Sequence, residues 1–437
     1  MKACPSSSRR LRVVASLLLA AAPATLFAGG MALTMQNGAH LAHAYSAGAA
    51  AEDASTVYFN PAGLASISRP EVIAGSTYVM FDGGFTNTGS LTVGMLPTAG
   101  ADDDDAGQDS AVPSIYIAIP LASSWFFGFG ASSPFGLRTS YDEGWVGRYH
   151  ALRSKLETIN LNPAIAWRAT ERLSLGLGFD WQRADATLTN AVDFGLIGFL
   201  NGVPGLLPGE LDGALRVSGD DSTTGFNAGA LLEVADGARI GVHFRSKMTH
   251  DISGQATFSN VPAPFAPLFP DQTASARLSL PEIVSVSYFQ ELSPSLAVMA
   301  DWSWWNWSRF ESLAIDFENP LTQDIVQRQN WTDASIYSLG LRWRSSSRFL
   351  WRAGLAYNES PVRSAAFRSA RIPDSDRIWL GLGTAVRLSD VAKIDVGYAH
   401  LFIKDTTTTN DDGVGHALIG NYSMSADIVS AQLTWGF

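Results

Sequence analysis

Cysteine and long apolar runs are nearly absent from this chain of 437 residues. Its single cysteine is Cys4, so no disulfide can join two parts of the chain, and a nearly thiol-free chain is typical of an oxidising compartment. After the first thirty residues, no apolar run reaches the ~20 residues that a membrane-spanning helix needs. These absences exclude a disulfide-stapled domain and a bundle of membrane helices.

Positive charge is scarce and partly concentrated at the start of the chain. Four basic residues precede an apolar stretch at 13–22, and small residues follow at Ala24 and Ala28, which is the pattern of a secretory signal peptide. We predict a signal peptide at 1–28 and favour cleavage after Ala28 over cleavage after Ala24. Its removal takes away four of the 30 Lys and Arg and none of the 41 Asp and Glu, which leaves 26 against 41 and a formal charge of −15. So acidic a surface argues against nucleic acid as a partner.

What the chain has in abundance is short segments in which apolar residues alternate with small or polar ones. In one of them, Leu175, Leu177 and Phe179 alternate with Gly176 and Gly178. This period of two is that of a β-strand whose two faces meet different surroundings. Fourteen such segments lie near residues 71–81, 113–121, 124–132, 155–168, 172–190, 222–234, 238–258, 273–290, 294–312, 331–344, 348–358, 376–388, 391–403 and 422–437.

The connections between these segments alternate strictly between short and long. The tight turns lie at 120–123, 169–171, 235–237, 291–293, 345–347 and 389–390. A soluble β-sandwich would share the periodicity but mix the lengths of its connections. Backbone groups that face lipid must pair with neighbouring strands, and only a closed barrel achieves this. The pattern predicts an all-β fold: a 14-stranded antiparallel transmembrane β-barrel over 71–437 in the bacterial outer membrane, with tight turns in the periplasm and long loops outside.

The barrel prediction also specifies the surroundings of the chain. Outer-membrane lipid and lipopolysaccharide would cover the outward side chains of a monomer. A cluster of four tryptophans, Trp302, Trp304, Trp305 and Trp307, is expected at the membrane–water boundary. The last strand ends on Phe437, and we expect the barrel-assembly machinery to contact the chain through this strand.

Two of the long connections, the third and the fourth, are apolar. The third contains Phe194, Leu196, Phe199 and Leu200, and the fourth contains Phe265, Leu268 and Phe269. Exposed apolar patches of this size usually mark a binding surface, so we predict a ligand groove between the two loops. In the alternative interpretation the loops only pack against each other or anchor in the outer leaflet.

The stretch at 29–70 differs from the rest because it has small residues and no long alternation. Proline removes a backbone donor and holds the preceding residue extended, so Asn60-Pro61-Ala62 indicates a defined bend. Because this stretch precedes the first strand, it must lie under the barrel or inside it. We predict that it is a hatch that plugs the lumen.

Several short motifs, in a fixed order along the chain, resemble those of one family. They are Ala44-Tyr45-Ser46-Ala47-Gly48 with Asn60-Pro61-Ala62, Ser133-Pro134-Phe135-Gly136-Leu137, Phe244-Arg245-Ser246-Lys247, Leu280-Pro281-Glu282, Trp305-Asn306-Trp307-Ser308-Arg309-Phe310, Glu359-Ser360-Pro361-Val362 and Asp374-Ser375-Asp376-Arg377-Ile378-Trp379-Leu380. The ordered series resembles the FadL family of outer-membrane transporters for long-chain fatty acids and other hydrophobic compounds, which includes OmpP1 and the TodX-like hydrocarbon channels.

This resemblance implies passive uptake by a definite route. Ligand would bind in the groove between the third and fourth loops, pass to a pocket in the lumen, and leave sideways at an inward kink of the third strand once the hatch rearranges. Fatty-acid members hold the carboxylate with basic residues of the fifth and tenth strands, and the matching positions here are the neutral Thr189 and Thr332. Arg183, Arg342 and Arg344 lie nearby and would either substitute or serve as structural lumen arginines. Fatty acids and uncharged hydrocarbons therefore both remain open as cargo.

No residue pattern indicates catalysis, a cofactor or a metal centre. The seven histidines lack a nucleophile context, which weakens the alternative of an outer-membrane lipid hydrolase. His40 and His43 have no third ligand at metal-like spacing. The acidic run at 102–105 is expected to be a solvated loop, with calcium binding as the alternative.

Overall fold

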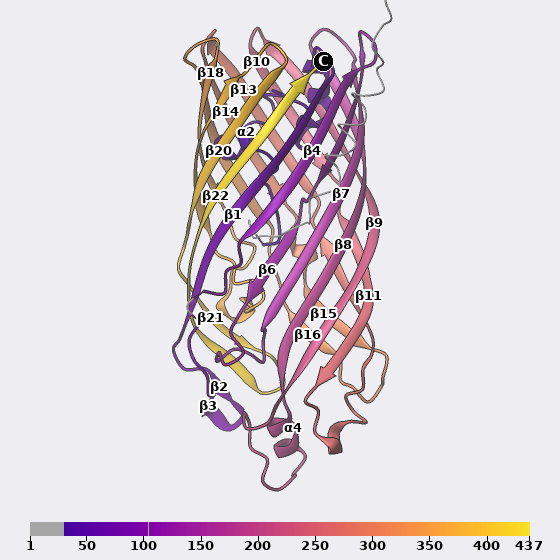
Figure 1. The fold of residues 1–437 in the computed structure, drawn as a ribbon, viewed down its shortest axis with the longest axis vertical. Helices are drawn as coiled ribbons and strands as arrows, with labels where there is room; N and C mark the ends of the chain where they lie inside the picture. The colour runs from indigo at the N-terminus through magenta and orange to yellow at the C-terminus, as the bar shows by residue number, and fades with distance from the viewer. Residues whose placement is uncertain (1–29, 104) are drawn as a thin grey trace, which may run out of the picture.

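The computed structural model describes residues 30–103 and 105–437, so the predicted signal peptide, with Cys4, lies outside the described residues. One sheet closes into a tall barrel of tilted strands (Figure 1). The spanning strands are β1 (Glu71–Asn87), β4 (Ser110–Pro120), β5 with β6 (Trp125–Ser132, Gly136–Ser140), β7 (Arg153–Arg168), β8 (Leu173–Asp193), β9 (Asp212–Ala235), β10 with β11 (Ala238–Arg245, Met248–Ser259), β12 with β13 (Gln272–Leu280, Ile283–Ser293), β14 with β15 (Leu296–Trp305, Ser312–Phe317), β16 with β17 (Ile325–Arg328, Ala334–Arg344), β18 (Phe349–Asn358), β19 (Arg377–Arg387), β20 (Ala392–Ile403) and β22 (His416–Gly436). These make fourteen antiparallel strands, as predicted.

The first and last strands close the barrel. All 17 residues of β1 pair with β22, from Glu71 opposite Gly436 to Asn87 opposite Gly420. The C-terminus and the tight turns lie at one end of the barrel, called here the short-turn end, and the long loops lie at the other, the long-loop end (Figure 1). The long loops carry the short elements β2 (Leu91–Thr92), η3 (Val93–Met95), β3 (Leu96–Pro97), α4 (Phe194–Leu200), η4 (Ala263–Phe265), η6 (Ala365–Phe367) and β21 (Thr406–Asp411), whereas η5 (Trp307–Arg309) lies in the interruption between β14 and β15.

Alternation along the strands separates an apolar outer face from a buried inner face. On β8, Leu177 and Phe179 are 56% and 51% exposed, whereas Asp180 and Gln182 are buried. A row of exposed apolar side chains around a closed sheet is the surface that a bilayer covers. None of the helices in the described part of the chain is long and apolar enough to cross a membrane.

The tryptophan cluster does not lie on one face, which corrects the prediction that all four rings mark the membrane boundary. Trp302 is 38% exposed on the outer face of β14, but Trp305 and Trp307 are buried. The two buried rings pack against Phe135, with ring centroids 6.4 and 6.1 Å away. Trp302 and Trp305 have opposite parity along the strand, so they must point to opposite faces.

The N-terminal segment, residues 30–70, packs against strands from both halves of the sheet. It contains α2 (Gly38–Ala42), α3 (Thr56–Phe59) and η2 (Pro61–Ser66). Helix α2 contacts β18, β19, β20 and β22, whereas η2 contacts β5, β7, β8 and β9. Nearly every residue from 30 to 65 is buried.

Glycines on the strands allow this close approach. A Cβ on Gly354 of β18 would lie 2.1 Å from the carbonyl carbon of His43, and one on Gly229 of β9 would lie 2.0 Å from Oδ1 of Asn60. Because real Cβ atoms do not come so close to other heavy atoms, larger residues at these positions would displace the N-terminal segment.

The third strand is interrupted, and the N-terminal segment bonds to the interruption. Strand β5 ends at Ser132 and β6 begins at Gly136, and the pairing of β4 with β5 stops at Ile115 opposite Ala131. In the described residues β6 has no strand partner other than β7. The main-chain N–H of Leu33 donates to Pro134 O (2.8 Å), and that of Gly136 donates to Met31 O (2.9 Å).

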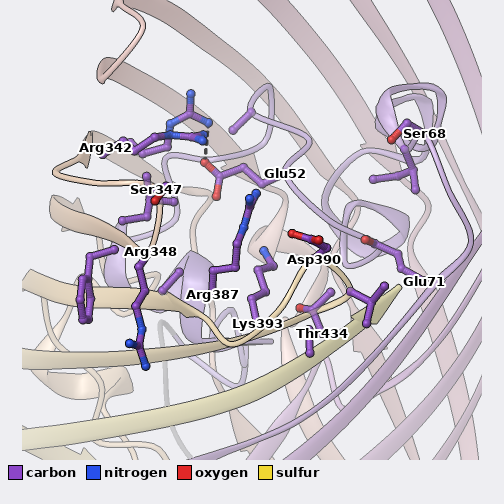
Figure 2. Close-up of a pocket in the computed structure, with 18 of the residues that line it drawn as sticks. Glu52, Ser68, Glu71, Arg342, Ser347, Arg348, Arg387, Asp390, Lys393 and Thr434 are labelled. Atoms are coloured by element: carbon purple, nitrogen blue, oxygen red, sulfur yellow. Dashed lines mark hydrogen bonds and ion pairs between the residues drawn. The ribbon is translucent and has the colours of Figure 1, made fainter. Parts of the chain in front are cut away.

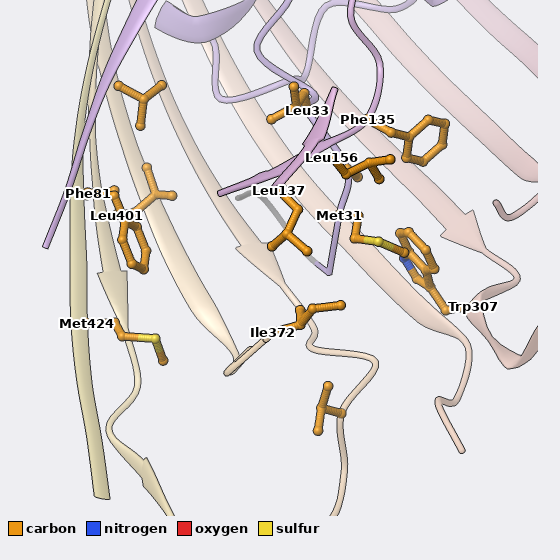
Figure 3. Close-up of a cluster of buried hydrophobic side chains, with 14 of the residues drawn as sticks. Met31, Leu33, Phe81, Phe135, Leu137, Leu156, Trp307, Ile372, Leu401 and Met424 are labelled. Atoms are coloured by element: carbon orange, nitrogen blue, oxygen red, sulfur yellow. The ribbon is translucent and has the colours of Figure 1, made fainter. Parts of the chain in front are cut away.

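A large apolar cluster joins these parts. It contains residues of the N-terminal segment, the third strand, the surrounding strands and the loop at 359–376, among them Met31, Leu33, Phe135, Leu137, Leu156, Trp307 and Ile372 (Figure 3).

Candidate functional site

The two apolar loops meet at the long-loop end. Asp193 caps α4 by accepting the N–H of Leu196 (2.8 Å), which fixes the start of the helix and directs Phe194 toward the fourth loop. The ring of Phe194 stacks on Phe265, with centroids 5.6 Å apart, and meets the edge of Phe269 at 5.2 Å. The two loops that the sequence singled out as apolar therefore lie in contact.

The predicted groove residues divide into two sets. Phe194, Leu196 and Phe265 are buried in the contact between the loops, and Leu268 and Phe269 are partly buried there. Phe199 and Leu200, one turn further along α4, are 46% and 59% exposed. The first set holds the loops together, and the second presents apolar surface to the outside.

Apolar side chains continue from these loops into the barrel. Phe258 of β11 lies 5.4 Å from Phe269 and 6.0 Å from Phe317, measured between ring centroids. It packs on a cluster built on Leu215, Ala256, Ala274 and Ile315, to which Leu188, Val217 and Ala276 also belong. Ile315, Leu188, Val217 and Ala276 also line a cavity further inside.

This inner cavity, with a volume of about 70 Å³, lies where the N-terminal segment, the third strand and the barrel wall meet. Met31, Leu137 and Ile372, which surround the same space in Figure 3, contribute apolar side chains to its wall. Two cations also line it, Lys155 of β7 and Arg371 of the loop at 359–376. The ammonium of Lys155 lies 2.7 Å from Glu157.

Arg371 is buried at the cavity without an acidic neighbour in contact. Its guanidinium donates to Ser154 Oγ (3.2 Å), Asn190 Oδ1 (3.1 Å) and the main-chain oxygen of Thr189 (3.5 Å). Burial lowers the pKa of Arg371 to about 10, which the interaction with Tyr141 only partly opposes. At neutral pH the side chain therefore still carries its charge in apolar surroundings.

The four lumen residues proposed from the sequence are not brought together. Arg183 shares a strand face with Phe179, so it points outward, and it pairs with Asp185 and Asp220 at 3.1 Å each. The hydroxyl of Thr189 accepts the main-chain N–H of Arg153, and Thr332 is exposed beside Arg363. Arg342 faces inward but near the short-turn end, and none of the four lines the inner cavity.

Sequence reasoning missed Arg371 and Met31. Both lie in segments without strand periodicity, so alternation could not assign them a face, and their contacts depend on how the loop and the N-terminal segment fold inward.

A network of charges lies at the short-turn end. Glu52 of the N-terminal segment pairs with Arg342 (2.9 Å) and Arg352 (2.8 Å), and Arg352 also pairs with Asp395 (2.6 Å). The network borders a cavity of about 610 Å³, where Figure 2 shows Glu52 beside Arg342 with Arg387 and Lys393 nearby. Burial alone would raise the pKa of Glu52, but the two arginines and His43 hold it well below its usual range.

The predicted bend at Asn60 also attaches the N-terminal segment to the barrel wall. The side-chain oxygen of Asn60 accepts the N–H of Ala62 (3.1 Å), which caps η2 at Pro61. Its amide nitrogen donates to Ala230 O of β9 (3.1 Å) and Val242 O of β10 (3.4 Å). One side chain thus sets the bend and bonds it to two strands.

Three carboxylates of the acidic run at 102–105 accept hydrogen bonds from main-chain N–H groups. Asp102 and Asp105 accept the main-chain N–H groups of Asn87 and Gly83, and Asp103 accepts that of Asp142. Within 30–103 and 105–437, no group of three or more His, Cys, Asp or Glu side chains is arranged to hold a metal ion.

Comparison with known proteins identifies similar sequences and folds. Residues 18–437 match the model of a family described as outer membrane protein transport protein (OMPP1/FadL/TodX). The chain is 28% identical over 409 residues to the long-chain fatty acid transport protein of Escherichia coli O6:H1, covering 89% of this chain and 90% of that protein. It is 27% identical over 417 residues to outer membrane protein P1 of Haemophilus influenzae, covering 88% of each chain.

Solved structures share the fold. A crystal structure of a Pseudomonas aeruginosa FadL homologue superposes with a TM-score of 0.87 at 23% identity, covering 94% of this chain and all of the other. The toluene transporter TodX of P. putida superposes with a TM-score of 0.71 at 17% identity, covering 88% of this chain and 94% of the other.

Proposed function

The chain belongs to the OMPP1/FadL/TodX family of outer membrane transport proteins, and from this premise we propose that it carries long-chain fatty acids or other hydrophobic compounds passively across the outer membrane. It is an outer-membrane β-barrel, and its family consists of transporters and channels rather than enzymes, which removes the alternative of a lipid hydrolase.

The observation that carries the proposal is a series of apolar contacts that leads inward from the third and fourth loops. It runs from Phe194 and Phe269 through Phe258 to residues that line the inner cavity. Phe199 and Leu200, on the same helix as Phe194, present exposed apolar surface at its outer end. Each buried square ångström of apolar surface contributes roughly 25 cal/mol, so successive small apolar surfaces bind a hydrophobic molecule moderately at each step. Moderate binding at every step permits both entry and release, and no energy source is required.

In this proposal the N-terminal segment acts as a hatch across the lumen. Its contacts with β5 to β9 on one side and β18 to β22 on the other support that position. Its charged clamp, made by Glu52 with Arg342 and Arg352, supports a hatch that is held in place rather than loosely inserted.

We propose that ligand leaves sideways at the break between β5 and β6. Support comes from the edge of β6, which the N-terminal segment covers through Met31 and Leu33. Met31 also lines the inner cavity, so a movement of this segment would open the cavity and the break together. Sideways release would deliver a hydrophobic molecule to lipid without passage through water.

The surroundings predicted from the sequence belong to the same proposal. The exposed apolar belt supports a monomer covered by outer-membrane lipid and lipopolysaccharide. Leu433, Trp435 and Phe437 project outward from the end of the chain, which supports contact of this strand with the barrel-assembly machinery.

Uptake by cells tests the proposal. Cells that lack the gene should take up labelled oleate or toluene more slowly than cells that carry it, and a plasmid copy should restore the rate. Loss of oleate uptake alone indicates a fatty-acid transporter, and loss of toluene uptake alone indicates a hydrocarbon channel like the TodX relative. Normal uptake of both compounds would refute the function.

A further inference from the structure

Arg371 differs from three other buried arginines, each of which pairs with a carboxylate. Arg245 lies 2.6 Å from Asp180, Arg352 lies 2.6 Å from Asp395, and Arg377 pairs with Asp374. In the described part of the chain no carboxylate forms an ion pair with Arg371, whose bonding partners are a hydroxyl, an amide oxygen and a main-chain carbonyl. A buried charge without a counter-charge is unfavourable, so the folded chain retains it at a cost.

The side chain lines the inner cavity, whose wall is otherwise mostly aliphatic. The other cation there, Lys155, is already paired with Glu157. An anionic group that entered the cavity would therefore meet one unpaired guanidinium, and its hydrocarbon part would contact Met31, Leu137, Leu188 and Ile372. Charge-assisted hydrogen bonds of this kind are the strong ones, and the planar guanidinium suits a carboxylate.

We infer that Arg371 determines cargo specificity by receiving the carboxylate of a long-chain acid in the inner cavity, so that ionised fatty acids are preferred over uncharged hydrocarbons of the same length. The inference rests on the transport function proposed above and assigns a residue and a ligand class to its lumen pocket. A cavity of about 70 Å³ holds only the head of such a molecule, so Met31 and the loop around Arg371 must move before the rest of the chain enters.

The same loop provides a matched control. Arg368 is also buried, but its guanidinium donates to the main-chain oxygens of Asp374, Val362 and Thr407, and it does not line the cavity. Substitution of Arg368 removes a buried cation from the same loop without changing the charge of the cavity.

The test is binding of oleate and of oleyl alcohol to the purified full-length barrel in a non-ionic detergent at a pH where oleate is ionised. The unaltered protein should bind oleate more tightly than the alcohol. Arg371→Met should weaken oleate binding by about tenfold or more and leave alcohol binding nearly unchanged, because only the charge pair is lost. Arg371→Lys should restore part of the preference, and Arg368→Met should leave the ratio of the two affinities unaltered.

The outcomes separate the inference from the function on which it rests. An equal fall in both affinities with Arg371→Met, or no preference for oleate in the unaltered protein, would overturn the role of Arg371 while transport stands. Failure of the unaltered protein to bind either compound, together with normal uptake in cells without the gene, would refute the transport function itself. If Arg371→Met does not fold, Arg371→Gln, which keeps donors toward Ser154 and Asn190, takes its place with the same expected result.

Discussion

Two buried arginines, one toward each end of the barrel interior, differ in how their charge is balanced. At the short-turn end, Arg352 is held between Glu52 of the N-terminal segment and Asp395 of β20, at 2.8 and 2.6 Å. Toward the long-loop end, Arg371 is just as deeply buried but bonds only to neutral groups beside an apolar cavity. A charge that is fully paired within the protein attaches two parts of the chain, whereas a charge without a carboxylate partner remains available to a ligand.

In the transport function proposed above, this difference would allow one interior both to stay closed and to accept cargo. The ion pairs of Arg352 fix the position of the N-terminal segment against the barrel wall. Removal of one member of a buried pair leaves the other charge uncompensated, so the pair resists separation. The inner cavity beside Arg371 can bind a ligand, because no carboxylate of the described chain pairs with that guanidinium.

The largest expected effect comes from removal of the attached segment. A chain without residues 30–62 should still form the barrel, because the spanning strands pair with one another, but its lumen should become an open channel. Single-channel recordings in planar bilayers should change from rare or no openings to a steady large conductance. A conductance equal to that of the full chain would show that the segment does not block the lumen.

A smaller effect is expected when only the charge clamp is broken. Glu52→Gln removes the charge shared by Arg342 and Arg352, which should lower the free energy of unfolding by about 3 kcal/mol and produce transient channel openings. Denaturant unfolding, followed by tryptophan fluorescence, measures the first effect. Arg183→Gln, which breaks an ion pair on the outer face, is the control and should leave both measurements nearly unchanged.

Acid should mimic that substitution in the unaltered chain. Because the pKa of Glu52 is held well below its usual value of 4.5, its contribution to stability is fully present above pH 4.5 and is lost only as the pH falls through the lowered value. Conductance should therefore be constant from pH 8 to pH 5 and rise only in stronger acid. Openings that begin near pH 6 would implicate a different group.

The smallest effect on stability, with a clear effect on binding, is expected at the outer loops. Phe199→Asp places a charge on an exposed part of α4, so it should weaken oleate capture while the unfolding free energy changes by no more than about 0.5 kcal/mol. Phe265→Asp should weaken capture and also loosen the contact between the loops, since Phe265 is buried against Phe194. Initial uptake rates and limited proteolysis of the loops distinguish the two variants, and normal capture in both would place the first binding surface elsewhere.

Most of the barrel follows from the sequence because strand periodicity and connection length are local properties. The fourteen strands could be predicted in this way, whereas the groove between the third and fourth loops was expected from their apolar composition and stays a prediction. The same periodicity predicts the orientation of Arg183, because Arg183 has the parity of the exposed Leu177 and Phe179 and must face outward with them. Parity likewise separates Trp305 from Trp302.

The inner cavity could not be predicted by the same means. Its wall combines Met31 of the N-terminal segment, Leu137 of β6 and Arg371 of a loop more than 230 residues further along the chain. Neither the segment nor the loop has a repeating pattern, and their positions follow from how they fold back onto the strands. An arginine in such a loop has no sequence signature that distinguishes it from a solvated one.

The pairing of β1 with β22 has a consequence for how the protein is made. These strands are the first and last of the sheet, and the seam between them joins residues about 350 positions apart. Until β22 has arrived, every partly translocated chain exposes two unpaired edges, to which other chains could add. Escort proteins in the periplasm would therefore have to shield the chain until its final residues emerge, and truncations near the end should provoke envelope stress out of proportion to their length.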